Sequence, residues 1–443
     1  ISLGCDKNLV DSEVMLGLLT KHGYTFTDDE TQADVIVINT CCFIHDAKEE
    51  SINTILEMAQ YKEQNLKALV VAGCLAERYK DEILKEIPEI DAVLGTTSYD
   101  SIVEAVNTAL EENTGEHFEH YESIDYLPDN SEVERVVTTG NHMAYLKIAE
   151  GCDKRCSYCI IPKIRGRFRS VPMQELLNEA KRLASEGVKE LVLVAQETTL
   201  YGKDLTGEKQ LPLLLHELCK IEGIEWIRLL YCYPEEITDE LIKVIKTEEK
   251  VCNYIDMPIQ HSENRILQRM GRRTSREDLV AVIKKLRKEI PDITIRTTLI
   301  TGFPGESQED HEGLMNFVEE CQFDRLGVFT YSPEEDTLAA TFEDQIDEEV
   351  KEERRDELMS LQQEISYEHT QQLVGKTIKV MVEGYLFEDD IYVGRSYMDA
   401  PKVDGCVFIN SPEELMTGDF VYVKITQGRE YDVIGEVDYE FTK

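Results

Sequence analysis

The chain has 443 residues, 42% of them hydrophobic, and a formal net charge of −41 from 47 Lys+Arg and 88 Asp+Glu. This length predicts about three domains, and no stretch approaches the roughly 18 consecutive apolar residues of a transmembrane helix. Because nucleic-acid affinity rests on cationic side chains that displace phosphate counterions, the charge argues against RNA or DNA as a primary partner. The negative charge favours a basic protein as partner. The alternative is that the acidity only keeps the protein soluble. We expect a cytoplasmic protein with no membrane partner.

Residues 1–125 are expected to form an N-terminal parallel α/β domain. Short apolar, largely β-branched runs alternate there with amphipathic helical patterns. The expected strands are residues 1–3, 35–38 and 69–72, and the expected helices are residues 10–20, 49–60 and 77–85. From residue 111 to residue 139 the chain is acidic and poor in aliphatic residues, so we expect an exposed linker, with residues 126–139 separating the first two domains.

Residues 140–342 repeat this alternation more regularly and predict a partial barrel of six βα units. Helical patterns at 172–186 and 276–289 fill two of the gaps between strands. The expected strands are residues 144–149, 191–195, 226–231, 254–259, 294–300 and 326–330.

The last hundred residues predict a helix followed by a small barrel. Residues 343–371 contain no Gly or Pro and are rich in strong helix formers, which indicates a connecting helix. Residues 372–443 change to a period of two and are punctuated by glycines, which indicates a small antiparallel β-barrel. The expected architecture is therefore a multidomain α/β protein with a C-terminal barrel.

Three cysteines lie close together after the first strand of the middle segment, in the run Cys152-Asp-Lys-Arg-Cys156-Ser-Tyr-Cys159. Three thiolates in one loop can bind three irons of a [4Fe–4S] cluster and leave the fourth iron open to a cofactor or substrate. A structural zinc loop and chance spacing are the alternatives. Zinc normally takes a fourth Cys or His, and the nearest histidines are distant in sequence at 142 and 216.

Three further cysteines each follow an expected strand of the first domain. Cys5, Cys41 and Cys74 come after residues 1–3, 35–38 and 69–72. Because the carboxyl ends of parallel strands meet at one edge of a sheet, we expect these cysteines to converge and hold a second cluster. The alternatives are buried structural cysteines and a competing ligand at the adjacent Cys42.

Two basic runs interrupt the acidic sequence. One follows the cysteine loop directly and can grip a carboxylate, since an arginine fork matches a carboxylate bidentately. The other precedes a helix, where solvated helix-flanking charge is an equal interpretation. The runs are Lys163, Arg165, Arg167 and Arg169, and Arg269, Arg272, Arg273 and Arg276.

The CxxxCxxC spacing at the start of a βα barrel resembles the radical S-adenosylmethionine (SAM) superfamily. The wider context resembles the methylthiotransferases over nearly the whole chain, and the tail resembles their TRAM module. The matching segments are residues 1–13, 39–41, 72–75, 148–162 and 165–167.

Within that family the chain is similar to the branch that modifies an aspartate of protein twelve of the small ribosomal subunit. Gly4-Cys-Asp-Lys-Asn8 is similar to the Gly-Cys-Pro-Lys-Asn of that branch, whereas the branch that modifies transfer RNA usually reads Gly-Cys-Gln-Met-Asn. Residues 195–202 and 331–335 also resemble the ribosomal-protein branch. Asp6 in place of proline and Cys42 after Cys41 depart from the pattern, but neither removes a ligand.

The resemblance implies an enzyme with two [4Fe–4S] clusters and SAM. The open iron of the Cys152/Cys156/Cys159 cluster would bind SAM, whose cleavage gives a radical that takes hydrogen from the β-carbon of the aspartate. The cluster on Cys5, Cys41 and Cys74 would present the methylated sulfur. Tyr158, Gln196 and Glu197 are expected to contact SAM.

The resemblance also implies two protein partners, a basic ribosomal protein as substrate and a reductant protein for the clusters. Residues 372–443 have a net charge of −7, from 7 basic and 14 acidic residues. We expect this tail to dock the substrate through the carboxylates of Glu388, Asp389, Asp390, Asp399 and Asp404. The alternatives for function are a methylthiotransferase acting on a tRNA adenosine and a non-enzymatic iron–sulfur carrier.

Overall fold

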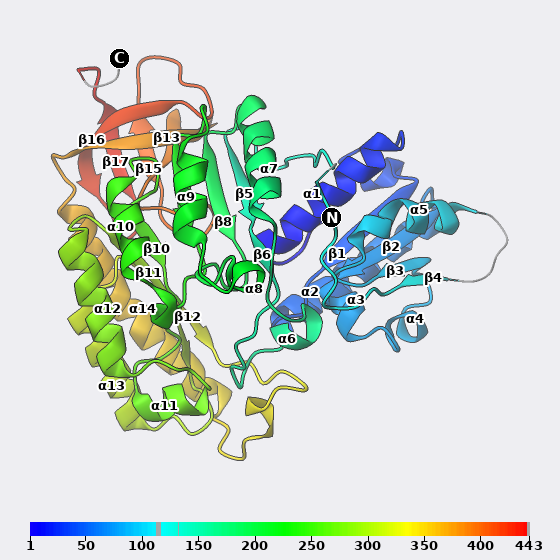
Figure 1. Cartoon of the computed structure of the whole chain (residues 1–443), viewed down its shortest axis with the longest axis horizontal. Coiled ribbons are helices and arrows are strands. Elements are labelled where there is room, and N and C mark those ends of the chain that lie inside the picture. Colours follow the sequence, from blue (N-terminus) through cyan, green and yellow to red (C-terminus); the bar gives the residue numbers. More distant parts are fainter. Residues whose placement is uncertain (112–116, 132, 441–443) are drawn as a thin grey trace.

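The computed structural model describes residues 1–111, 117–131 and 133–440, and Figure 1 shows three bodies along the chain. The N-terminal domain (blue and cyan) lies on one side of a central barrel (green), and a smaller barrel (orange and red) covers one end of it. In the described residues no helix is long and apolar enough to cross a membrane.

The N-terminal domain is a four-stranded parallel sheet with helices on both faces, as the sequence predicts. The apolar residues of α1 and α5 pack on one face of the sheet, and those of α2, α3 and α4 pack on the other. The strands are β1 (Val35–Thr40), β2 (Ala68–Gly73), β3 (Ala92–Leu94) and β4 (Phe118–His120), in that order across the sheet. The helices are α1 (Asp6–Lys21), α2 (His45–Ala59), α3 (Cys74–Arg78), α4 (Ile83–Glu86) and α5 (Ile102–Leu110).

Three local expectations for this domain differ from the structure. Residues 1–3 form no full strand, and only Ser2 bridges to Asn39 beside β1. The helix expected over residues 77–85 is interrupted at 79–82: α3 ends at Arg78, whose side chain pairs with Glu334 in a distant loop, and α4 begins at Ile83. Strand β4 lies within the segment expected as an exposed linker, where Arg135 is also buried against α1. Residues 112–116 and 132 of that segment lie outside the described part of the chain.

The central barrel has six parallel strands in two sheets, β5-β8-β9 and β10-β11-β12. The Cys232 N–H, just beyond β9, donates to the carbonyl of Asp256, the last residue of β10, at 2.8 Å and joins the two sheets. This open arrangement agrees with the predicted partial barrel. The strands are β5 (Met143–Lys147), β8 (Glu190–Val194), β9 (Trp226–Leu229), β10 (Tyr254–Asp256), β11 (Thr294–Thr301) and β12 (Arg325–Thr330).

Helices surround these strands, and two short strands flank the cysteine loop. The short strands are β6 (Ala149–Glu150) and β7 (Arg169–Ser170), which pair antiparallel. The helices are α6 (Ile161–Ile164), α7 (Met173–Ser185), α8 (Lys203–Thr206), α9 (Leu211–Cys219), α10 (Asp239–Thr247), α11 (Asn264–Arg269), α12 (Arg276–Glu289) and α13 (Gln308–Cys321). Single 3-10 turns occur at Glu30–Gln32, Gln60–Glu63, Tyr99–Ser101, Pro234–Glu236 and Ala339–Thr341.

The connecting helix α14 (Glu348–Gln371) packs along the barrel and ends beside the C-terminal domain, where Thr370 donates to the Arg429 carbonyl at 2.5 Å. That domain is a closed five-stranded barrel in the order β13-β14-β15-β17-β16. Four of its pairs are antiparallel and the β15–β17 pair is parallel. Its strands are β13 (Thr377–Leu386), β14 (Ile391–Ser396), β15 (Val407–Asn410), β16 (Phe420–Gly428) and β17 (Val433–Val437).

The small barrel covers the amino ends of the central strands. Glu190, the first residue of β8, pairs with Arg228 at 2.8 Å and with Arg395 of the small barrel at 2.6 Å. Asp399 and Asp404 also face the central barrel, where they pair with Arg325 and Arg296. These two aspartates are therefore buried in the domain interface, so the expectation that they dock a substrate is wrong.

Candidate active site: two cysteine groups joined by a buried polar network

The first cysteine group lies in the loop between β6 and α6, at the carboxyl end of the central strands. Cys152 and Cys156 are buried, and Cys159 is half-buried. Burial raises the pKa of Cys152 to about 12, and the neighbouring Cys156 charge adds to the shift. The three thiols therefore lie near one another and are largely shielded from solvent.

Backbone hydrogen bonds hold this loop in place. The Cys152 N–H donates to the Gly166 carbonyl at 3.1 Å, and the Ser157 N–H donates to the Met270 carbonyl at 2.9 Å. The Ser157 hydroxyl donates to the Arg269 carbonyl at 2.8 Å. The loop is therefore fixed by segments that belong to both predicted basic runs.

The three residues expected to contact SAM lie around this loop. Tyr158 meets the Phe303 ring edge-on, with ring centroids 6.5 Å apart. The Gln196 amide donates to Glu150 at 2.8 Å. Glu197 is fully buried with one oxygen 3.5 Å from the Lys154 ammonium. Their contact with SAM stays a prediction.

The second cysteine group gathers at the carboxyl edge of the N-terminal sheet. Cys5 precedes α1, Cys41 follows β1, and Cys74 begins α3 directly after β2. Burial raises the pKa of Cys41 and of Cys74. The Cys5 charge adds to both shifts, and the Cys42 and Cys41 charges add to that of Cys74. Three cysteines far apart in sequence therefore converge at one edge.

Two glycines allow the backbone turns beside these cysteines. Gly4 has φ +83°, and a Cβ there would lie 2.8 Å from the Cys41 sulfur. Gly73 has φ +93°, and a Cβ there would lie 2.2 Å from the Asn39 side-chain oxygen. Any other residue at these positions would be strained and would crowd the cysteine edge.

Cys42, the possible competing ligand, has the contacts of a packing residue. Its side chain is fully buried, and its thiol donates to the Cys74 carbonyl at 3.1 Å. Burial raises its pKa to about 12. These contacts are typical of a packing cysteine.

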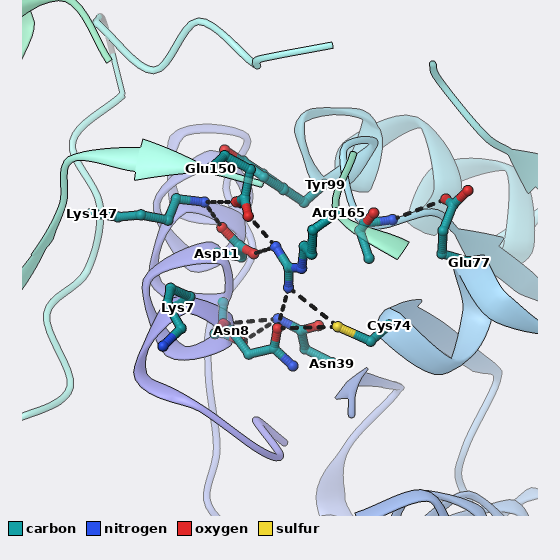
Figure 2. Close-up of polar contacts among 12 residues, drawn as sticks. Lys7, Asn8, Asp11, Asn39, Cys74, Glu77, Tyr99, Lys147, Glu150 and Arg165 are labelled. Atoms are coloured by element: carbon teal, nitrogen blue, oxygen red, sulfur yellow. Dashed lines mark hydrogen bonds and ion pairs between the residues drawn. The ribbon is translucent and has the colours of Figure 1, made fainter. Parts of the chain in front are cut away.

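Arg165 connects the second cysteine group to the barrel (Figure 2). Its guanidinium is buried, and Nη2 donates to the Cys74 sulfur at 3.5 Å and to the Asn8 side-chain oxygen. Nη1 lies 2.8 Å from Asp11 and 3.1 Å from Glu150. The first basic run does bind carboxylates, as predicted. Those carboxylates belong to the chain itself, because Arg165 pairs with Asp11 and Glu150.

Lys147 completes a buried set of four charges. Its ammonium lies 2.9 Å from Glu150 and also pairs with Asp11. Burial opposes ionisation of Glu150, but the Lys147 and Arg165 charges hold the pKa of that carboxyl well below its usual range. Two cations and two anions therefore balance at the boundary between the first two domains.

The second basic run is mainly structural. Arg272 lies over the Tyr233 ring, 4.5 Å from its centroid, and donates to the Pro258 carbonyl at 2.9 Å. Arg269 pairs with Asp344 at 2.6 Å, and Arg276 pairs with Glu263. The interpretation of this run as solvated charge does not hold for Arg272, which is buried behind the cysteine loop.

Both cysteine groups offer a donor set that suits an iron–sulfur cluster. In the described residues no group of three or more His, Cys, Asp or Glu side chains is placed to hold one metal ion. A cluster is larger than an ion, so its thiolate ligands stand apart on different irons. Three soft sulfur donors in a buried setting, with no carboxylate among them, are the donor set that iron–sulfur clusters take.

An open parallel barrel with this cysteine loop at its carboxyl end defines a radical-SAM fold. The matching family models are the Radical SAM superfamily over residues 146–318, the Uncharacterized protein family UPF0004 over residues 1–95 and the TRAM domain over residues 374–437. A structure of the radical SAM methyltransferase TsrM from Kitasatospora setae, with cobalamin and a [4Fe–4S] cluster bound, has a TM-score of 0.56. The match covers 83% of this chain and 76% of that chain at 13% identity, so it shows the fold alone.

Curated relatives then define the family. The "Ribosomal protein uS12 methylthiotransferase RimO" of Lachnoclostridium phytofermentans is 62% identical over 439 residues, which cover 99% of each chain. Proteins of the same description from Acetivibrio thermocellus and Thermoanaerobacter sp. are 51% and 50% identical, and the matches cover at least 98% of each chain. The chain belongs to the RimO-type branch of the radical SAM methylthiotransferase family.

Proposed function

We propose that this enzyme places a methylthio group on the β-carbon of an aspartate in ribosomal protein uS12. The observation that carries the proposal is the pair of three-cysteine groups, held at the carboxyl edges of two parallel sheets and linked by the consecutive residues Arg165 and Gly166. The reaction opens a C–H bond and forms a C–S bond, and two cysteine groups provide one site for each step. The full-length similarity to RimO proteins supports uS12 as the substrate.

The two cysteine groups would hold clusters with different roles. Cys152, Cys156 and Cys159 would hold one [4Fe–4S] cluster whose open iron binds SAM, while Cys5, Cys41 and Cys74 would hold the second. When bound, these cofactors supply the radical and the sulfur, because an unactivated C–H bond offers no acid–base route. The chain itself positions both groups and buries most of their thiols, with Cys5 and Cys159 half-buried.

The basic uS12 protein is expected to approach an acidic surface. With Asp399 and Asp404 buried, the remaining tail candidates are Glu388, Asp389 and Asp390, in the loop between β13 and β14 where they are exposed. A reductant protein would supply electrons to the clusters, and a protein with these partners would work in the cytoplasm.

Separate loss of the two clusters tests the ligand assignment. After anaerobic reconstitution, Cys152/Cys156/Cys159→Ala should keep about half of the iron and form no 5′-deoxyadenosine from SAM and reductant. Cys5/Cys41/Cys74→Ala should also keep about half of the iron, but should still form 5′-deoxyadenosine and transfer no methylthio group. Loss of all iron from either triple variant would refute the assignment. An iron–sulfur carrier without catalysis would form no 5′-deoxyadenosine in the wild-type protein.

A further inference from the structure

One short run of chain contacts both cysteine groups. Gly166 accepts a hydrogen bond from the Cys152 N–H at 3.1 Å. The preceding residue, Arg165, donates from Nη2 to the Cys74 sulfur at 3.5 Å. Gly166 thus contacts the first cysteine group, and its neighbour Arg165 contacts the second.

The backbone around this run is closely packed and adopts conformations that favour glycine. Gly151 has φ +74°, and a Cβ there would lie 2.1 Å from the Arg167 carbonyl oxygen. Gly166 has φ +71°, and a Cβ there would lie 2.2 Å from the Ile124 carbonyl oxygen. Because three chain segments meet at these glycines, the position of Arg165 relative to the Cys152 loop is fixed.

The guanidinium is also fixed in orientation. Nη1 faces the carboxylates of Asp11 and Glu150, and Nη2 faces Asn8 and Cys74. A planar fork with this many partners in different directions holds one orientation. Figure 2 shows the guanidinium between the two carboxylates and the sulfur.

We propose that Arg165 is a positioning residue for the second cysteine site, where its N–H group at the Cys74 sulfur raises the reduction potential of the cluster. The inference rests on the proposed function, in which Cys74 is a cluster ligand. Reduction adds negative charge to a cluster, and hydrogen bonds to its sulfurs stabilise the added charge. The Arg165 donor should therefore favour the reduced form.

The test isolates the second cluster in the full-length chain. The parent is the Cys152/Cys156/Cys159→Ala protein, reconstituted anaerobically, and the measurement is the midpoint potential of its remaining cluster. The test variant adds Asp11→Asn and Arg165→Gln, which remove one charge of each sign and leave the Lys147–Glu150 pair balanced. The single addition of Arg165→Lys, which keeps the positive charge, is a second variant in case the double change fails to fold.

A matched control is present at the same domain boundary. Arg135 is also buried. Its Nη1 donates to Glu13 of α1 at 2.5 Å, its Nη2 donates to the Tyr145 carbonyl, and its Nε forms an ion pair with Glu179. Glu13→Gln with Arg135→Gln therefore removes a buried pair between the same two domains but no donor to a cysteine sulfur.

The predicted result is a more negative midpoint potential in the Asp11/Arg165 variant and an intermediate one in Arg165→Lys, with the control equal to the parent. Loss of iron from the Asp11/Arg165 variant alone would also support the positioning role. Equal potentials in the parent and in the Arg165 variants would overturn the inference, as would an equal change in the control. A parent without iron would refute the ligand assignment itself, and the inference with it.

Discussion

Arg165 and Glu197 are both buried beside the cysteine groups, but their charges are balanced differently. Arg165 and Lys147 face two carboxylates, Asp11 and Glu150, so that set is neutral. Glu197 shares the single Lys154 ammonium with Glu235 and Glu236. Burial raises the pKa of Glu197 to about 7, and the two neighbouring carboxylates add to the shift while Lys154 and Thr199 oppose it. Burial is thus the main reason that the pKa of Glu197 is raised, and Glu235 and Glu236 add to it.

This raised pKa predicts a pH-dependent stability. Because the folded state binds the Glu197 proton more tightly than the unfolded state, the contribution is complete below about pH 4.5 and is lost as the pH rises through about 7. The shift from 4.5 to about 7 corresponds to roughly 3 kcal/mol at 1.36 kcal/mol per pKa unit. Urea unfolding of the apoprotein at pH 5 and pH 8 should show this loss in the wild type and a smaller one in Glu197→Gln. Parallel pH profiles for the two proteins would contradict the prediction.

Cys42→Ala should leave both clusters in place. The substitution removes a thiol that donates to the Cys74 carbonyl, so we expect a stability loss of roughly 1 kcal/mol from the hydrogen bond and the small cavity. The iron content after reconstitution should equal that of the wild type. A protein that bound half of the iron would identify Cys42 as a ligand in place of Cys41.

Among the elements, the small C-terminal barrel depends on a buried ion cluster where it meets the central strands. Glu190 of β8 lies between Arg228 of β9 and Arg395 of β14, and all three side chains are buried. Both arginines act to hold the pKa of Glu190 down against its burial, to about 2. One carboxylate therefore neutralises two arginines from different domains, with Glu383 as a further partner of Arg395.

Glu190→Gln should consequently loosen the small barrel. Removing the carboxylate leaves two buried guanidinium groups short of a partner, which typically costs about 3–5 kcal/mol. Urea unfolding should show this loss of stability, and limited proteolysis should show faster cleavage at the interface. The matched control is Glu225→Gln, which breaks an exposed pair with Lys379 across the same two domains and should cost at most about 1 kcal/mol. Equal effects of the two substitutions would show that the buried cluster does not hold the interface.

Across the whole molecule, the acidic tail and the cysteine loop lie at opposite ends of the central barrel. The small barrel covers the amino ends of the strands, whereas the Cys152 loop follows their carboxyl ends (Figure 1). Substrate docking at the β13–β14 loop would thus act on association and not on the chemical step.

Replacing Glu388, Asp389 and Asp390 with Ser should weaken uS12 binding at low salt. Exposed charge pairs contribute about 0.2–1 kcal/mol each, so together we expect roughly a fivefold loss of affinity, mostly in the association rate. The effect should fade at high salt, where the Debye length falls below about 10 Å. Unchanged affinity and salt dependence would leave these carboxylates as solubilising surface.

The sequence predicted regular elements far better than it predicted long-range contacts. The strand–helix alternation and the CxxxCxxC run are local patterns, so the barrel and the first cysteine group were accessible from them. Strand β4 was missed because Phe118–His120 is short and follows an acidic stretch. The role of Arg165 was only partly visible, because its partners Asn8, Asp11 and Cys74 lie at least 91 positions away in the chain. Asp399 and Asp404 were misassigned because sequence alone does not show which carboxylates an interface buries.

The proposed function requires the two cysteine groups to act together on uS12. Its most direct test is mass spectrometry of purified uS12 and, separately, of tRNA after incubation with reconstituted enzyme, SAM and reductant. We expect one methylthio group on a single aspartate of uS12 and no modification of tRNA, with transfer lost in Cys5/Cys41/Cys74→Ala. A methylthio-modified adenosine in tRNA with unmodified uS12, or full transfer to uS12 by that triple variant, would contradict it.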